Sequence, residues 1–162
     1  MTSTSVRLEK LSQQEFDTYY LVALERLANE MARARDLSAE EALKLAQQSF
    51  DSLLPRGRVG TTDQYLFKIL AGDTRVGILH FGIKRDRVKP FAFVWDIEIH
   101  STCRGKGYGE LSMLALESKV KELGLSSIGL NVFGHNATAI RLYKKLGYRI
   151  SSMAMVKDVY SP

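Results

Sequence analysis

The sequence has little of what cross-links a chain or anchors it in a membrane. Among its 162 residues there is one cysteine, Cys103, so no internal disulfide can form, which fits a reducing compartment. No apolar run approaches the roughly 20 residues needed to span a bilayer, and the opening Met-Thr-Ser-Thr-Ser is unlike a signal peptide. We therefore expect a cytoplasmic protein with no membrane partner. Its length suits a single domain over residues 1–162, with residues 1–5 as a flexible tail.

Dense blocks of one charge are also missing. The chain has 23 Lys and Arg against 18 Asp and Glu, a net charge of +5, and an isoelectric point near 9.3. These cations are spread along the chain and form no dense Lys/Arg block with interleaved aromatic residues, which argues against a nucleic-acid surface. A small phosphorylated ligand needs only a few well-placed cations, and it fits the charge at least as well.

Two helices are predicted in the first third of the chain. Apolar residues at helical spacing begin after Ser12, and Glu15 three positions later completes a capping box. Ser38 and Glu41 repeat this arrangement, so a second helix is expected to begin there and to run to about Leu53.

Farther along the chain the apolar period changes to two, which predicts strands. The order of elements implies an α/β (α+β) fold with one mixed, mostly antiparallel sheet and helices on both faces. Strands are predicted at 6–8, 64–70, 76–83, 91–99 and 128–133, helices at 107–123 and 136–146, and one strand or two short ones at 148–159.

The predicted strand 91–99 alternates apolar and polar residues, so the two kinds are expected on opposite faces of the sheet. The polar face would carry Asp96, Glu98 and His100, and the apolar face Phe93, Trp95, Ile97 and Ile99.

A glycine-rich turn, Cys-Arg-Gly-Lys-Gly-Tyr-Gly at 103–109, follows that strand and precedes a helix. Such a turn presents backbone N–H groups at the positive end of the helix dipole, and phosphate oxygens can approach because no Cβ intervenes. Taken alone, it also fits a tight turn whose glycines only permit positive φ. A P-loop would need Gly-Lys followed by Ser or Thr, and a Rossmann fingerprint would need glycine where Glu110 stands, so neither fits.

A second segment, 135–148, also enters a predicted helix from a predicted strand. Together the two segments resemble the GCN5-related N-acetyltransferase (GNAT) superfamily, with signatures over about Ile97–Tyr148. Its acetyl-CoA signature, Arg/Gln-x-x-Gly-x-Gly/Ala, is matched by Arg104, Gly107 and Gly109. Its later pattern, Asn-x-x-Ala-x-x-Leu-Tyr-x-x-Leu-Gly-Tyr/Phe, is matched by Asn136, Ala139, Leu142, Tyr143, Leu146, Gly147 and Tyr148. The N-terminal part resembles a small bacterial branch without an assigned substrate.

The resemblance implies a GNAT fold whose sheet splays at a cleft for acetyl-CoA, the acetyl donor, and it implies no metal. Pantetheine would lie between the segment from Ile97 to Ile99 and the segment Leu130–Val132, and Asn136 would reach it from the last helix. The pyrophosphate would rest on the backbone N–H groups of Arg104, Gly105, Lys106, Gly107, Tyr108 and Gly109, with the two cations adding charge. Dimers are common in the family, so a homodimer is a further expectation.

The resemblance also implies direct attack of an amine on the thioester. Tyr143 is the candidate acid for the departing thiolate, although it also continues an apolar helix stripe and could simply pack. Asp96 and Glu98 point the same way and are candidate bases or ligands for a cationic amine, unless they are only solvated or salt-bridged. Many relatives carry a glutamate where this chain has Asn131, so that common base is absent here.

Three further alternatives stay open. Cys103 lies before a helix and beside Arg104, so a covalent acetyl-cysteine is conceivable, but the family usually proceeds without one. We expect a small cationic amine as acceptor, with a protein N-terminus or lysine as the alternative. A module that binds CoA without turnover is the rival from another class.

Overall fold

Both predicted capping boxes form, and each begins a helix at the expected residue. The Ser12 hydroxyl accepts from the Glu15 N–H at 3.2 Å, the Ser12 N–H donates to the Glu15 carboxylate at 2.7 Å, and α1 spans Gln13–Arg35. Ser38 and Glu41 repeat this pair at the start of α2, Ala39–Leu53. These hydrogen bonds hold the pKa of both glutamates below the usual value.

The computed structural model describes residues 5–55 and 61–160, so the tail predicted at 1–5 lies outside the described residues apart from Ser5. Over these ranges the strands form a 5-stranded sheet in the order β1-β2-β3-β4-β5. The first four are antiparallel neighbours, and β5 pairs parallel to β4. The bounds are β1 Arg7–Lys10, β2 Gln64–Ala71, β3 Thr74–Lys84, β4 Phe91–Ile99 and β5 Ile128–Leu130. The predicted mixed, mostly antiparallel sheet is confirmed.

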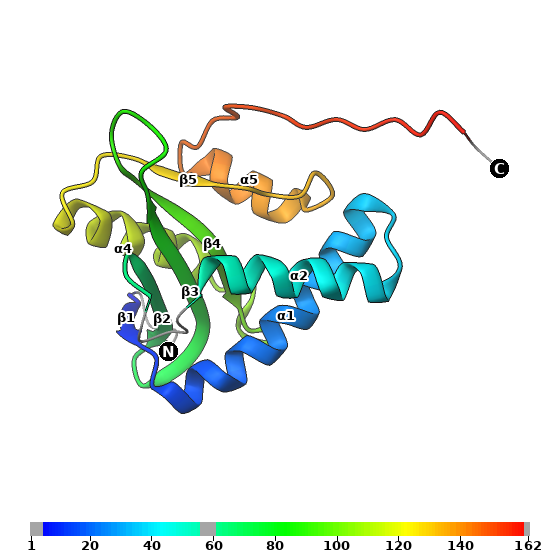
Figure 1. The fold of residues 1–162 in the computed structure, drawn as a ribbon. Coiled ribbons are helices and arrows are strands. Elements are labelled where there is room, and N and C mark those ends of the chain that lie inside the picture. The colour runs from blue at the N-terminus through cyan, green and yellow to red at the C-terminus, as the bar shows by residue number, and fades with distance from the viewer. Residues whose placement is uncertain (1–4, 56–60, 161–162) are drawn as a thin grey trace.

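Helices cover the sheet on both faces, as Figure 1 shows. On one face, α1 and α2 enclose a cluster that includes Phe16, Phe50 and Ile78. On the other face, α4 (Tyr108–Glu122) buries Met113 and Leu116 against the sheet, and α5 (Ala137–Lys145) adds partly buried residues to this cluster. The second cluster is the larger, and it forms the main core.

The faces of β4 differ from the strict alternation predicted for residues 91–99. Phe81 pairs with Val94 but His80 pairs with Asp96, so Trp95 is an extra residue that bulges from the ladder. Val94, in place of Phe93 or Trp95, therefore shares the α4-side core with Ile97 and Ile99. The prediction of a common face for Phe93, Trp95, Ile97 and Ile99 is wrong, because a bulge reverses the parity of every residue after it.

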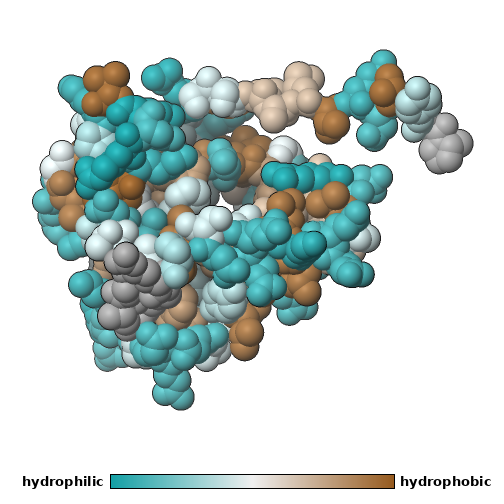
Figure 2. Space-filling view, in the orientation of Figure 1, coloured by the Kyte–Doolittle hydropathy of each residue, from teal (hydrophilic) through white to brown (hydrophobic). Residues whose placement is uncertain are grey.

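The C-terminal strands predicted at 148–159 are also absent. Tyr148 packs against the main core, but residues 149–160 form neither helix nor strand and are exposed throughout. Figure 1 shows this segment in red, running from the end of α5 away from the sheet, and Figure 2 shows apolar residues along it. A strand needs a hydrogen-bonded neighbour, and none of the described strands pairs with this segment.

Candidate active site

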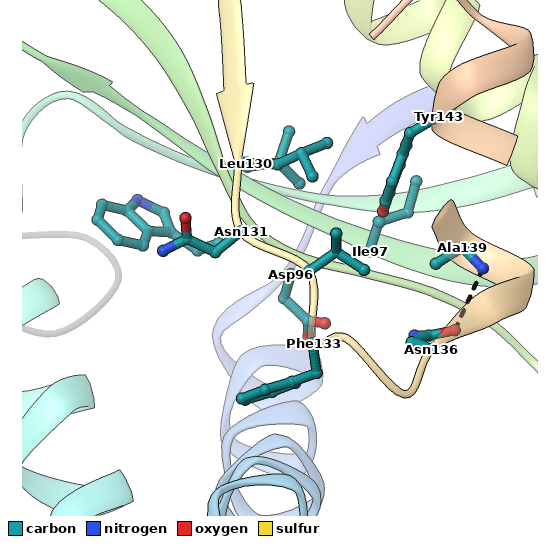
Figure 3. Close-up of a pocket in the computed structure, with 11 residues that line it drawn as sticks. Asp96, Ile97, Leu130, Asn131, Phe133, Asn136, Ala139 and Tyr143 are labelled. Carbon is teal, nitrogen blue, oxygen red and sulfur yellow. Dashed lines mark hydrogen bonds between the residues drawn. The ribbon is translucent and has the colours of Figure 1, made fainter. Parts of the chain in front are cut away.

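A narrow pocket opens where β4 and β5 separate. The two strands pair at three positions only, Ala92–Ile128, Phe93–Gly129 and Val94–Leu130. The bulge at Trp95 follows at once, and from there β4 continues to Ile99 without a partner on this side, while β5 ends at Leu130. The walls of the pocket are Val94, Trp95, Asp96, Ile97, Leu130, Asn131, Val132, Phe133, Asn136, Ala139 and Tyr143 (Figure 3). The predicted splay of the sheet is thereby confirmed.

The two carboxylates of β4 form ion pairs with a residue that the sequence analysis did not single out, Arg26 of α1. Its guanidinium group contacts Asp96 through one nitrogen and Glu98 through another. The Tyr19 hydroxyl donates a hydrogen bond to Asp96 at 2.9 Å. Both carboxylates are therefore salt-bridged in the structure. Tyr19 and Arg26 are seven residues apart and share a face of α1, a spacing that could have linked them.

The environment distinguishes Asp96 from Glu98. Burial raises the pKa of Asp96, while Arg26 and the Tyr19 hydroxyl act in the opposite direction. Burial, together with the negative charge of Asp96, raises the pKa of Tyr19 well above its ordinary value. Asp96 also lines the pocket, and Glu98 is not among the lining residues. Of the two carboxylates, Asp96 is thus the one that a molecule bound in the pocket would contact.

The glycine-rich turn begins with a short 3-10 helix, Ser101–Cys103, and ends at α4, which starts one residue later than predicted. Gly105 and Gly107 have φ of 73° and 82°, which side chains rarely adopt. Gly107 is the N-cap of α4 and makes no side-chain capping bond, so the first N–H groups of the helix are not capped by a side chain. The Tyr108 side chain is buried in the main core, and only its backbone can meet a ligand.

Gly109 serves a different purpose from the other two glycines. A Cβ at this position would lie 3.2 Å from Cδ2 of Leu142, which belongs to α5. The absence of a side chain therefore allows α5 to pack closely against the start of α4. This contact holds the helix that carries Tyr143 beside the turn.

Two cations flank the turn, and both contact the backbone that precedes it. Arg104 donates through Nε to the carbonyl of Ile99 at 2.9 Å, and its NH2 lies 3.7 Å from Glu98. Lys106 donates to the carbonyl of Thr102 at 3.4 Å. The Arg104 side chain is 60% exposed, so it remains accessible to an anion on the turn. Cys103 is half-buried.

The start of α5 and its middle contribute Asn136 and Tyr143 to the pocket. The Asn136 side-chain oxygen accepts from the Ala139 N–H at 3.2 Å, so the amide NH₂ is the end of this side chain that can serve a ligand (Figure 3). Figure 3 shows the Tyr143 hydroxyl directed toward the space beside Ile97. Burial, with the nearby charge of Asp96, raises the pKa of Tyr143. The raised pKa keeps the Tyr143 hydroxyl protonated at neutral pH.

A second connection from α1 reaches the pocket wall. His135 Nε2 lies 2.6 Å from the Glu30 carboxylate, and its ring stacks on Phe133 at 5.7 Å between centroids. Neither His135 nor Glu30 is among the residues predicted to be functional. Among the described residues, no group of three or more His, Cys, Asp and Glu side chains is placed to hold a metal ion. No described helix is long and apolar enough to cross a membrane.

The mixed sheet separates beside the N-terminus of α4, which Gly107 precedes, and Tyr143 of α5 lies across the gap. This is the arrangement of an acetyltransferase of the GNAT fold. Residues 21–148 match the model of the Acetyltransferase (GNAT) family, and the chain belongs to that family. It is therefore an enzyme of the N-acetyltransferase class.

Two relatives from Bacillus subtilis (strain 168) match nearly the whole chain. The "Uncharacterized N-acetyltransferase YdgE" is 27% identical over 153 residues, which are 94% of this chain and 97% of the relative. The "Uncharacterized N-acetyltransferase YycN" is 29% identical over 156 residues, 96% of this chain and 99% of the relative. The crystal structure of YycN superposes with a TM-score of 0.90 and covers 97% of this chain and 100% of that one.

A more distant structure shares the fold alone. It is an aminoglycoside acetyltransferase from an uncultured soil metagenomic sample, solved in complex with sisomicin, with a TM-score of 0.55 and 17% identity. The match covers 97% of this chain and 95% of that chain.

Proposed function

We propose that the enzyme transfers an acetyl group from acetyl-CoA to a primary amine by direct attack of the amine on the thioester. The observation that carries this proposal is the juxtaposition of the turn and the pocket. The turn offers N–H groups that no side chain caps, and the adjoining pocket holds Tyr143 and Asp96. The turn suits a pyrophosphate, and the gap beside β4 suits an extended pantetheine arm.

Different residues around the gap would bind different parts of acetyl-CoA. The N–H groups from Arg104 to Gly109 would bind the pyrophosphate, with Arg104 and Lys106 adding positive charge. Among the described residues no strand pairs with β4 from Ile97 to Ile99 on the pocket side, so its polar groups can pair with the amides of pantetheine. The NH₂ of Asn136 can donate to the same arm.

The acetyl transfer then needs two proton movements. The amine nitrogen forms a bond to the thioester carbon, and the bond between that carbon and sulfur breaks. The Tyr143 hydroxyl gives its proton to the departing thiolate, and Asp96 accepts, directly or through a water molecule, the proton that the amine must lose. Arg26 and Tyr19 hold the Asp96 carboxylate in place. Asn131, which also lines the pocket, is neutral and cannot act as the base.

A small cationic amine remains the acceptor we propose. Asp96 is the acidic residue among those that line the pocket, which favours an ammonium group there. Peptide N-termini and lysines are the alternative acceptors. The partners proposed are thus acetyl-CoA and an amine, in the cytoplasm and without nucleic acid.

The test is release of CoA thiol in the presence of an acceptor panel. Polyamines, amino acids, aminoglycosides and short peptides would each be added with acetyl-CoA, and acetylated products identified by mass. We expect thiol release with at least one small amine and little with peptides. Acetyl-CoA binding without any acceptor-dependent thiol release would instead indicate a binding module.

A further inference from the structure

The bulge in β4 places an aromatic side chain, Trp95, at the pocket beside Asp96. Val94 packs in the main core, so its neighbour Phe93 faces the opposite side of the sheet, where α1 lies. The Trp95 ring lies 4.5 Å from that of Phe93, measured between centroids, and therefore belongs to the same side. Asp96 contacts α1 on this side too. Two consecutive residues of β4 thus share one face, which regular alternation would not allow.

A second aromatic side chain, Phe133, borders the pocket from the chain that follows β5. Its ring stacks on that of His135, with centroids 5.7 Å apart and planes 9° apart, and His135 Nε2 lies 2.6 Å from Glu30 of α1. Figure 3 shows Phe133 and Asp96 directed toward the same side of the strands. α1 therefore holds both groups in place, Asp96 through Arg26 and Phe133 through His135.

The opposite side of the gap is lined differently. Ile97, Leu130 and Tyr143 pack against the main core, on the side of α4, and Figure 3 shows them across the strands from Phe133. The glycine-rich turn proposed to bind the pyrophosphate also leads into α4. The donor would thus occupy the α4 side of the gap, and the acceptor would approach from the α1 side, past Trp95, Asp96 and Phe133.

Asp96 offers one of its two carboxylate oxygens to an acceptor. Among the described residues, the Tyr19 hydroxyl and the Arg26 guanidinium both contact Oδ2. Oδ1 is therefore the oxygen that can accept a hydrogen bond from an ammonium group. Asp96 is the acidic residue among those that line the pocket, so a second ammonium group would meet no further carboxylate in this lining. The site favours an amine with one positive charge over a polyamine or an aminoglycoside.

Trp95 leaves aromatic surface available at this site. It is 37% exposed, and it is the single tryptophan of the chain. A large ring that is partly in water can bury more area, and gain stacking energy, against a flat ring of a ligand. We propose that Trp95 and Phe133 form the walls of the acceptor site, and that the acceptor is a primary amine joined by a short chain to an aromatic ring. This inference rests on the acetyl transfer proposed above and names the class of amine that receives the acetyl group.

The first test measures acceptor binding without turnover. CoA would replace acetyl-CoA, so no acetyl group can be transferred, and phenethylamine would be titrated while the fluorescence of Trp95 is followed. Because the chain has one tryptophan, a shift of its emission to shorter wavelength reports that Trp95 leaves water. We expect this shift with phenethylamine and little shift with spermidine. The absence of a shift with phenethylamine, or an equal shift with spermidine, would overturn the proposal.

The second test compares kcat/KM for phenethylamine and butylamine, which carry the same ammonium group with and without a ring. We expect a preference of about 10-fold or more for phenethylamine. Trp95→Ala and Phe133→Ala should each lower kcat/KM for phenethylamine by about 10-fold and leave that for butylamine within about threefold. Trp95→Phe keeps a ring and should keep most of the preference. Leu114→Ala, at a residue of α4 that is 43% exposed, is the control and should change neither value.

The two tests distinguish failure of this inference from failure of the proposed function. Acetyl transfer to spermidine or an aminoglycoside in preference to phenethylamine would overturn the aromatic acceptor and leave the acetyl transfer intact. Binding of phenethylamine beside CoA, with no thiol release from acetyl-CoA, would support the aromatic site and overturn the transfer. If Trp95→Ala and Phe133→Ala lower kcat/KM equally for both amines, the rings act only through the fold and the proposal is wrong.

Discussion

Arg26 of α1 and Asp96 of β4 form an ion pair that ties the first helix to the floor of the candidate active site. The side chains are 30% and 20% exposed, and the same guanidinium also contacts Glu98. Pairing offsets the cost of partly burying the two carboxylates, and it fixes the direction in which Asp96 points. α1 therefore also sets the electrostatic environment of the proposed base.

Loss of this cation should destabilise the protein. Arg26→Met leaves two half-buried carboxylates beside each other, and we expect a loss of about 2 kcal/mol in the free energy of unfolding, less than for a fully buried pair because solvent screens part of the charge. Urea unfolding at pH 7 measures it. Arg33→Met, an exposed residue on the same helix, is the control and should change stability by less than about 0.5 kcal/mol. Equal losses would show that the pairing is unimportant.

Removal of the Tyr143 hydroxyl should affect turnover more than donor binding. General acid catalysis contributes about 100-fold or more, so Tyr143→Phe should lower kcat by about that factor while leaving the Kd of acetyl-CoA within about threefold. Steady-state kinetics measure kcat, and calorimetry measures the Kd of acetyl-CoA.

The chain offers a matched control in Tyr148, whose ring lies 5.6 Å from that of Tyr143. The Tyr148 hydroxyl is buried and has no hydrogen-bond partner among the described residues. Tyr148→Phe should therefore keep both activity and stability. If the two variants behave alike, Tyr143 acts only by packing.

The role of the glycine-rich turn can be tested by comparing two glycines that have similar φ angles, one inside the turn and one outside it. Gly107 and Gly124 have φ of 82° and 72°, and a Cβ at either would meet no atom within 4 Å. Valine at either position should thus cost a similar amount, about 1 kcal/mol. Only Gly107→Val should also weaken acetyl-CoA binding, because its side chain would stand where the pyrophosphate is proposed to rest. Similar acetyl-CoA affinity in both variants would refute the role of the turn.

Sequence and structure agree where the signal is local. The capping boxes at Ser12 and Ser38 need only residues three positions apart, and the glycine turn is defined by its own φ angles. The bulge at Trp95 and the contact of Arg26 with Asp96 depend on elements far apart in the chain, so no local pattern shows them. Residues 148–159 are predicted as one strand or two short ones, but a strand forms only where another strand can pair with it.

The two carboxylates should differ in their effect on catalysis. Asp96 lines the pocket and Glu98 does not, so Asp96→Asn should lower kcat/KM by about 100-fold, and Glu98→Gln should lower it much less. Burial raises the pKa of Asp96, so activity should be lost on acidification at a pH above that expected for an ordinary aspartate. The acidic limb of a pH profile of kcat/KM measures this loss of activity. A larger loss in Glu98→Gln would assign the base to Glu98.

His80 should make the fold sensitive to mild acid. It is 1% exposed on β3, its Nε2 lies 2.9 Å from Gln64, and burial lowers its pKa to about 3. Because the folded pKa lies below the unfolded value of about 6.5, the fold prefers neutral His80. Its contribution is therefore complete above about pH 6.5 and is lost as pH falls toward 3, by up to about 1.4 kcal/mol per pH unit.

Urea unfolding at pH 7 and 5.5 should show this loss, and His80→Gln should reduce it. His100→Gln leaves His80 in place and should retain the full loss. An unchanged pH dependence in His80→Gln would mean that His80 does not carry this loss of stability.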